Sequence, residues 1–365
     1  MTSKRLFSNA FSLDFRREIA PFILYFIVFF VCLPLSFIIW RSLTFPVMGV
    51  TMSLYEIVHS LVFGSAQIFL VLFAFTETLH QFGFLHRRQE TDFVHALPVS
   101  RTKIFFTRFV SGILSVLIPF LTCEILAALI VRFAFNVQGF FVPYITGVGI
   151  SVLFFLGIYS LNVTAYLLTG KALTGVVGTL ILQFFFPVIA LFHDILSGIR
   201  GSGELSLEFL AKWSPVTAFA EIADWFERIF YPAHYYSYWH ADNPINGPLA
   251  LAVMAVLVVL LYILNRRLYQ KRPMERAGDA MSFAVTETPI QIILTVFGGL
   301  FGGIFFGTLA YNSFWYYFGV VFGTVLTHCL VELIYTTDIR QAFKKPVILA
   351  ISLAVSLAIA ALYSI

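Results

Sequence analysis

Nine long runs of apolar residues divide the chain, and each is long enough to predict a helix that crosses a membrane. Such a helix needs about 20 mostly apolar residues. The runs cover residues 22–40, 57–79, 109–131, 143–169, 172–196, 248–265, 290–310, 314–335 and 346–364. The sequence does not show the ten-residue alternating segments of a membrane barrel. We therefore expect an all-α polytopic membrane protein with about nine transmembrane helices.

The composition supports this class. Hydrophobic residues make up 59% of the 365 residues, and charged residues make up 12%. A typical globular chain has about 45–50% apolar and about 25% charged residues. So few charges cannot cover the surface of a soluble protein, and a disordered chain would be poor in apolar residues.

Lys and Arg are concentrated in alternate loops. If the N-terminus lies inside and the spans alternate, eighteen of the 23 Lys and Arg residues fall on the inner side. The five that remain outside are Arg41, Arg132, Arg200, Lys212 and Arg228. Because cytoplasmic loops hold the excess of these residues, we expect a cytoplasmic N-terminus and an external C-terminus.

Two segments outside the spans have an amphipathic pattern. Phe7, Phe11 and Phe15 recur every four residues, which predicts a helix over residues 1–20 on the inner leaflet, although an ordinary start of the first span would fit as well. In the external loop 197–247, Ser214 followed by Pro215 is typical of a helix start. Apolar residues then follow a 3.6-residue period until Pro232, so we expect an external amphipathic helix at the outer interface: Phe219, Ile222, Ala223, Phe226, Ile229 and Phe230.

The inner loop from about His80 to Arg108 predicts a short helix. Gly83 can end the preceding helix, Pro98 prevents a helix over about 86–96 from continuing, and Ser100 is a candidate N-cap for the third span. A helix with charges of both signs and a few apolar residues can dock on a soluble partner; the alternative is a solvated loop. The candidate docking residues are Arg87, Arg88, Glu90, Asp92, Phe93, Leu97, Pro98, Ser100 and Arg101.

The chain shows no motif for nucleotide or metal chemistry. Near Gly170-Lys171-Ala172, Ala165 stands where a phosphate-binding loop needs its first Gly, and Ala172 stands where that loop needs Ser or Thr. Neither a Ser/His/Asp set nor a metal-ligand spacing is present in the sequence. We therefore expect no catalytic residue, no metal site and no enzyme activity on this chain, and we disfavour a membrane enzyme.

Glu124 is the deepest ionisable residue in the predicted spans. An ionised carboxylate at the bilayer centre costs about 2.5–3.5 kcal/mol on insertion scales, so it is a functional candidate. An ion- or proton-coupled secondary carrier that uses Glu124 is the alternative function. A buried hydrogen bond to a neighbouring helix is the structural interpretation.

The seventh span has small residues four apart, in Gly298/Gly302 and Gly299/Gly303. Small residues at this spacing let helix backbones approach closely in a membrane. The pattern predicts helix packing.

The run from Arg87-Arg88-Gln89-Glu90-Thr91-Asp92 to Ala96-Leu97-Pro98-Val99-Ser100-Arg101-Thr102-Lys103 resembles the coupling region of ABC-2-type transporter permeases. This resemblance implies a permease subunit, expected to be an exporter, in which the 86–101 helix docks on a separate ABC ATPase. ATP and Mg would bind to that ATPase, so this chain would hold no cofactor. The resemblance also implies a second permease subunit, in a homodimer or a heterodimer, within the lipid of a bacterial plasma membrane. We expect no nucleic acid partner.

The same resemblance implies three parts of the chain. Residues 1–20 look like a connecting helix and 21–265 like a six-span core. The last three spans, in 266–365, depart from that core, and we interpret them as an appended membrane extension. A second run, Lys271-Arg272-Pro273-Met274-Glu275-Arg276-Ala277-Gly278, resembles a subgroup of bacterial permeases from lantibiotic-export or cell-envelope-stress operons.

The charge distribution yields a test of topology. Cysteines placed at Gly203 and Asn243 should react with an impermeant thiol reagent in intact cells, because both lie in the expected external loop. A cysteine at Gln89 should not react until the cells are opened. Labelling of Gln89→Cys in intact cells would reverse the expected orientation.

Overall fold

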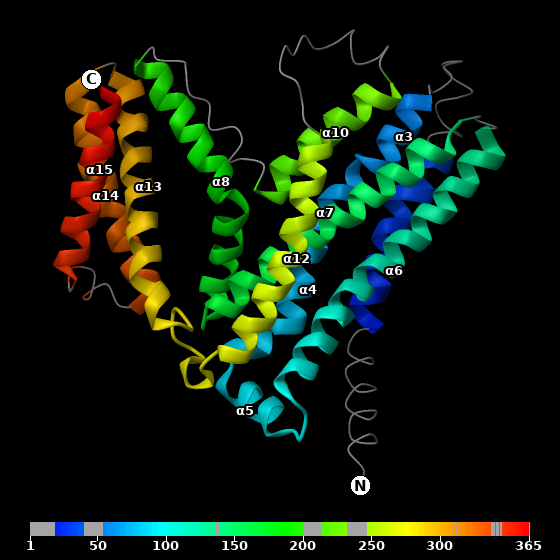
Figure 1. The fold of residues 1–365 in the computed structure, drawn as a ribbon, viewed down its shortest axis with the longest axis horizontal. Helices are drawn as coiled ribbons and strands as arrows, with labels where there is room; N and C mark the ends of the chain where they lie inside the picture. The colour runs from blue at the N-terminus through cyan, green and yellow to red at the C-terminus, as the bar shows by residue number, and fades with distance from the viewer. Residues whose placement is uncertain are drawn as a thin grey trace. The chain divides into compact units, whose positions relative to one another are not determined.

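The computed structural model describes residues 19–39, 54–135, 139–200, 213–231, 247–310, 312–336, 340, 343 and 345–364. Within these ranges the regular elements are helices (Figure 1), with one isolated bridge between Thr169 and Met281. The expected amphipathic helix over residues 1–20 lies almost wholly outside the described residues. The stretch after Tyr231, which contains Pro232, lies outside them too.

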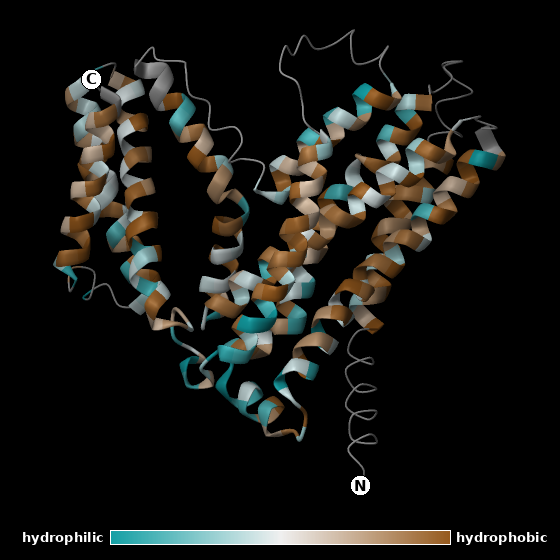
Figure 2. Cartoon of the chain, viewed as in Figure 1, coloured by the Kyte–Doolittle hydropathy of each residue, from teal (hydrophilic) through white to brown (hydrophobic). Residues whose placement is uncertain are grey.

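Eight helical segments of the described chain are long and apolar enough to cross a membrane: Ile19–Ile39, Leu54–His86, Arg101–Phe133, Phe141–Leu168, Ala172–Ile195, Gly247–Lys271, Ala284–Ala310 and Ser313–Thr336. Figure 2 shows hydrophobic residues along these helices. The ninth expected span corresponds to a shorter apolar helix, Pro346–Leu362. The prediction of an all-α polytopic membrane protein is confirmed, and the fourth and fifth spans are separate helices.

The labelled helices after the first span have these bounds: α3 Leu54–Val62, α4 Ser65–Phe82, α5 Arg88–Ala96, α6 Arg101–Phe135, α7 Phe141–Leu168, α8 Ala172–Arg200, α10 Pro215–Phe230, α12 Gly247–Lys271, α13 Ala284–Ala310, α14 Ser313–Thr336 and α15 Pro346–Ser364. Packing divides the chain into two compact units. The first comprises residues 1–84, 93–164 and 212–270, and the second comprises residues 85–92, 165–211 and 271–365. The division of the chain at residue 266 stays a prediction.

The second span is interrupted, although its apolar run predicts one continuous helix. The break falls at Gly64, between α3 and α4, and leaves the backbone oxygen of Val62 without its usual helical partner. The buried side chain of Gln67 donates its amide to that oxygen and also lies 2.7 Å from the hydroxyl of Ser151 on α7. Two polar side chains therefore satisfy the broken backbone inside an apolar setting, as a membrane requires.

Helix α10, which the sequence predicts on the outer side, begins at the predicted residue. Ser214 precedes it, Pro215 is its first residue, and the Ser214 hydroxyl accepts the backbone N–H of Val216 at 3.3 Å. Its apolar face packs against the other helices of the first unit. The ring of Phe219 lies 4.1 Å from that of Phe154 on α7, and Phe226 is buried. Phe219, Ile222 and Phe226 therefore serve protein packing, whereas Ile229 is 51% exposed. The periodicity could not distinguish protein contact from lipid contact.

In the second unit, α13 and α14 approach closely through glycines. A Cβ atom added at Gly302 would collide with the backbone oxygen of Gly319, and one added at Gly319 would collide with that of Gly302. Small residues permit this approach, which gives close van der Waals packing where lipid removes the hydrophobic drive. The packing predicted from the Gly298/Gly302 spacing is observed.

This contact can be tested with a matched pair of substitutions. Gly302→Ala should destabilise the protein by about 1–3 kcal/mol, since the methyl group has no space. Gly149→Ala is the control, because the same methyl group on α7 would meet open space. Thermal unfolding in detergent should show a loss only for Gly302→Ala; equal melting temperatures would contradict the close α13–α14 contact.

Candidate functional site: the segment between α4 and α6

The loop between α4 and α6 folds as a short helix with defined ends. Helix α4 ends at Phe82, a 3-10 turn covers Gly83–His86, and α5 follows. The backbone oxygen of Ser100 accepts the N–H groups of Lys103 and Ile104 at 2.9 and 3.2 Å, which begins α6. The sequence signals at Gly83, Pro98 and Ser100 thus placed the ends of these elements correctly.

One face of α5 is exposed. Its members are Gln89, Glu90, Asp92, Phe93 and Ala96, and the side chain of Phe93 is 71% exposed. The guanidinium of Arg87, just before the helix, lies 2.7 Å from the Glu90 carboxylate, and both side chains are solvated. The exposed face therefore presents one aromatic ring between acidic side chains, of which only Glu90 has a described cation.

The remaining candidate residues lie around this face. Leu97 is half-buried, whereas Pro98, Ser100 and Arg101 are exposed. The guanidinium of Arg101 donates to the backbone oxygen of Gln270 at 3.2 Å. Arg101 thus links the start of α6 to the end of α12.

The opposite side of α5 is anchored at each end. In the second unit, Arg88 donates from Nε to the backbone oxygen of Ala277 at 2.7 Å. In the first unit, the ring of His95 stacks on Tyr269 with centroids 6.0 Å apart. Thr91 is buried between these two anchors along the helix. Because both ends are held, α5 is a fixed element and not a solvated loop.

Arg272 is the residue that sequence reasoning missed. It is 2% exposed, and its guanidinium donates to four backbone oxygens. The acceptors are Tyr166 at 2.7 Å, Leu167 at 2.9 Å, Thr169 at 2.8 Å and Leu85 at 3.1 Å. Three of these oxygens lie at the end of α7, where a helix leaves carbonyl groups without partners, and Leu85 lies two residues before the first candidate docking residue.

Residues 272–282, here called the clasp, continue this arrangement. Its Ser282 N–H donates to the backbone oxygen of Leu168 at 2.8 Å, and its Gly278 N–H donates to that of Gly170 at 2.8 Å. Gly278 has a φ of 95°, a conformation that glycine adopts without the steric cost of a side chain. Residues 272–278, which carry the resemblance together with Lys271, are therefore part of a turn that joins the end of α7 to the segment before α5.

Glu124 lies in a closed environment on α6. Its side chain is 1% exposed, and the hydroxyl of Tyr144 lies 2.8 Å from Oε2 and 2.7 Å from its backbone oxygen. Within the described part of the chain, Oε1 has no hydrogen-bond partner and no cation pairs with this carboxylate. This environment fits a structural hydrogen bond between α6 and α7.

A second buried carboxylate, that of Glu332 on α14, has a nearby positive charge, the ammonium of Lys345. It accepts from the amide of Gln291 on α13 at 2.7 Å and lies 3.4 Å from the ammonium of Lys345, which also pairs with Glu287 at 2.9 Å. Burial alone would lower the pKa of Lys345, but the two carboxylates outweigh it and raise that pKa. The network ties the residue before α15 to α13 and α14.

Among the described residues, no group of His, Cys, Asp and Glu is arranged to hold a metal ion.

Comparison with known proteins gives one distant likeness. Over 220 residues the chain is 25% identical to a protein of Bacillus subtilis (strain 168) named "Probable ABC transporter permease YtrD". The alignment covers 60% of this chain and 62% of that relative's length. No family model and no solved structure matches the chain. The apolar helices of the described chain support a multi-pass membrane protein.

The clasp can be tested through Arg272. Arg272→Lys keeps the charge but replaces the planar guanidinium, which has five N–H donors, with an ammonium group, which has three. Several of the four carbonyl groups therefore lose the hydrogen bond from residue 272. Each unsatisfied buried group costs about 1–3 kcal/mol, and we expect a much lower melting temperature. The exposed neighbour Arg267 provides the control: Arg267→Lys should unfold like the wild type. If the two variants unfold alike, the four bonds of Arg272 contribute little.

Proposed function

We propose that this chain is the membrane-spanning permease subunit of an ABC-2-type transporter and that a separate ATPase docks on residues 86–101. The observation that carries the proposal is α5, a short polar helix anchored on one side and exposed on the other. The likeness to a protein named as a transporter permease supports the same role, and a permease of this kind works with an ATPase partner.

The anchors of α5 suit the transmission of force. Arg88 joins α5 to the clasp, and the clasp is bonded to the end of α7 through Arg272 and Ser282. A displacement of α5 would therefore reach a membrane span through hydrogen bonds between defined atoms. The sequence has no phosphate-binding loop, so the energy would come from ATP and Mg bound to the partner.

The exposed face of α5 suits a protein groove. Phe93 offers an apolar ring for burial, while Glu90 and Asp92 offer charges that set the register of the docked helix. Charges at the rim of an interface affect the association rate more than the lifetime of the complex. The buried ring should therefore dominate the affinity, since a few central residues carry most interface energy.

The proposal extends to the assembly. A second permease subunit, identical or different, would complete the membrane part, and the complex would export its substrate across a bacterial plasma membrane. The chemistry would lie on the ATPase, so this chain would have no catalytic residue. A carrier that uses Glu124 gains no support from the structure, because the described surroundings of that carboxylate provide a tyrosine and no charge to couple with.

The docking proposal is tested by removing the apolar contact. Phe93→Ala combined with Leu97→Ala should weaken binding of the partner ATPase, which we expect to co-purify with the wild-type chain, by at least about 30-fold if the pair costs 2 kcal/mol or more. Affinity pull-down with that purified protein measures the loss. Phe133→Ala is the control, because Phe133 is 83% exposed but lies at the other end of α6.

Charge reversal gives an independent readout. Glu90→Lys should weaken assembly most at low salt, because salt screens exposed charges. Full recovery of the ATPase with both variants, together with normal substrate-stimulated ATP turnover, would contradict docking on this segment.

A further inference from the structure

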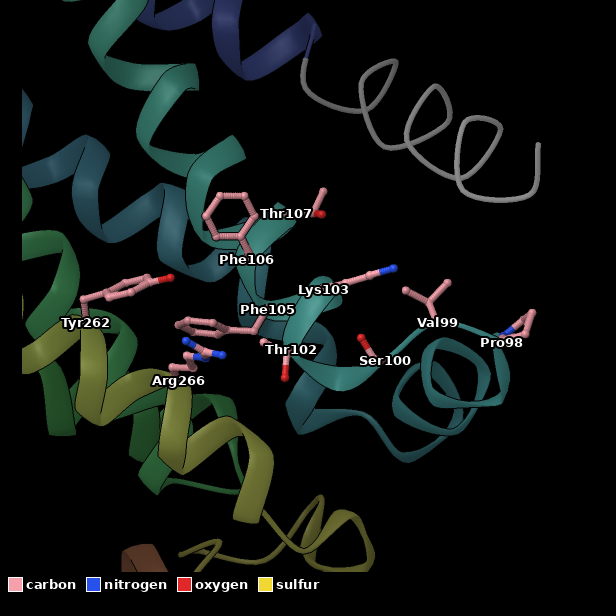
Figure 3. Close-up of a pocket in the computed structure, with 10 residues that line it drawn as sticks. All are labelled: Pro98, Val99, Ser100, Thr102, Lys103, Phe105, Phe106, Thr107, Tyr262 and Arg266. Carbon is pink, nitrogen blue, oxygen red and sulfur yellow. The ribbon is translucent and has the colours of Figure 1, made fainter. Parts of the chain in front are cut away.

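A cavity of about 570 Å³ lies in the first unit between the beginning of α6 and the end of α12 (Figure 3). One side of it is formed by Tyr262 and Arg266. The other side is formed by Pro98, Val99, Ser100, Thr102, Lys103, Phe105, Phe106 and Thr107. Small-molecule sites have volumes of about 300–1,000 Å³. The cavity is therefore large enough to take a polar headgroup.

The lining has an excess of positive charge. It includes Lys103 and Arg266 but no acidic residue. Neither side chain has a partner among the described residues. In Figure 3, Arg266 lies near Tyr262 toward one end, and Lys103 lies near Ser100 toward the other. An anionic group between the two helices would meet cations that nothing described in the chain neutralises.

The rest of the lining is amphipathic. Ser100, Thr102 and Thr107 contribute hydroxyl groups, whereas Phe105, Phe106 and Tyr262 contribute aromatic rings. Of these rings, that of Phe106 belongs to a residue that is 54% exposed. Both helices are membrane spans, and the cavity lies at the ends that carry their charges. Aromatic rings beside Lys and Arg at a span end are typical of the headgroup level. A free phosphate ion would leave the rings unused, while a lipid would contact both rings and cations.

We propose that this cavity binds the headgroup of an anionic phospholipid. Lys103 and Arg266 pair with the lipid phosphate, the hydroxyl groups donate to its oxygens, and Phe106 contacts the glycerol and the first part of the acyl chain. Basic pockets between spans are known to suit such headgroups. The site shares Pro98, Val99 and Ser100 with the end of the proposed docking segment 86–101. Its two cations, Lys103 and Arg266, lie outside that segment, so their substitution tests lipid binding separately from the ATPase surface on α5.

The test measures lipid binding to the delipidated full-length protein. Fluorescent phosphatidylglycerol should bind more tightly than fluorescent phosphatidylcholine in the same detergent micelles. Lys103→Gln with Arg266→Gln should weaken phosphatidylglycerol binding by about 30-fold, on the basis of two cations beside an anionic lipid. Arg267→Gln, on the same helix but outside the lining, should leave it unchanged, and Arg266→Lys should retain most of it.

Each other outcome overturns the proposal. Equal binding of both lipids, or equal losses for Arg267→Gln and Arg266→Gln, would show a general surface charge effect and no site. Full displacement of the lipid by soluble glycerol phosphate at equal concentration would identify a site for free phosphate esters. Variants are compared only where their melting temperatures match the wild type; if neither Gln substitution folds, Phe106→Ala must weaken phosphatidylglycerol binding, or the proposal fails.

Discussion

The buried guanidinium of Arg272 supplies hydrogen-bond donors to the carbonyl groups at the end of a membrane helix, α7. The last carbonyl groups of a helix have no partner within it, and only three residues separate α7 from α8. Arg272 donates to Tyr166, Leu167 and Thr169 there. A buried cation loses its hydration, but the negative end of the α7 dipole and four carbonyl oxygens offset that loss. All four of these acceptors are backbone oxygens, and their bonds to Arg272 hold the turn between α7 and α8 in place.

The guanidinium of Arg272 also donates to the backbone oxygen of Leu85. The clasp therefore contacts the segment that leads into α5. The chain leaves α4 through the 3-10 turn that contains Leu85 and then enters α5, where Arg88 bonds back to the clasp. The end of α7, the clasp and the beginning of α5 are thus joined by hydrogen bonds between fixed groups. A partner that moves α5 would act on the end of a span, which is what a permease driven from outside the membrane requires.

Charged groups inside the spans differ from those at the ends near α5 in whether they have a partner within the protein. Within the spans, the buried carboxylates have internal partners: Tyr25 and Gln81 for Glu77, Tyr144 for Glu124, and Gln291 with Lys345 for Glu332. Such pairing is what burial demands. At the ends near α5, Phe93 is exposed, and Lys103 and Arg266 have no described partner. Each of these buried carboxylates therefore has a partner within the protein. The groups at the ends near α5 form the surfaces that we propose to bind a protein on α5 and a lipid beside α6.

Features that depend on neighbouring residues could be predicted from the sequence. Long apolar runs predicted the spans, Gly83 and Pro98 bounded α5, and Ser214-Pro215 began α10, because chain geometry and burial act locally there. The tertiary structure alone decided which face of α5 is free, that Gly64 interrupts the second span, and that Arg272 is a buried donor. Each of these depends on atoms far apart in the chain: Gln67 and Ser151 meet at the broken helix, and Arg272 meets the end of α7. Local periodicity carries no information about such long-range contacts, because only tertiary packing brings the partners together.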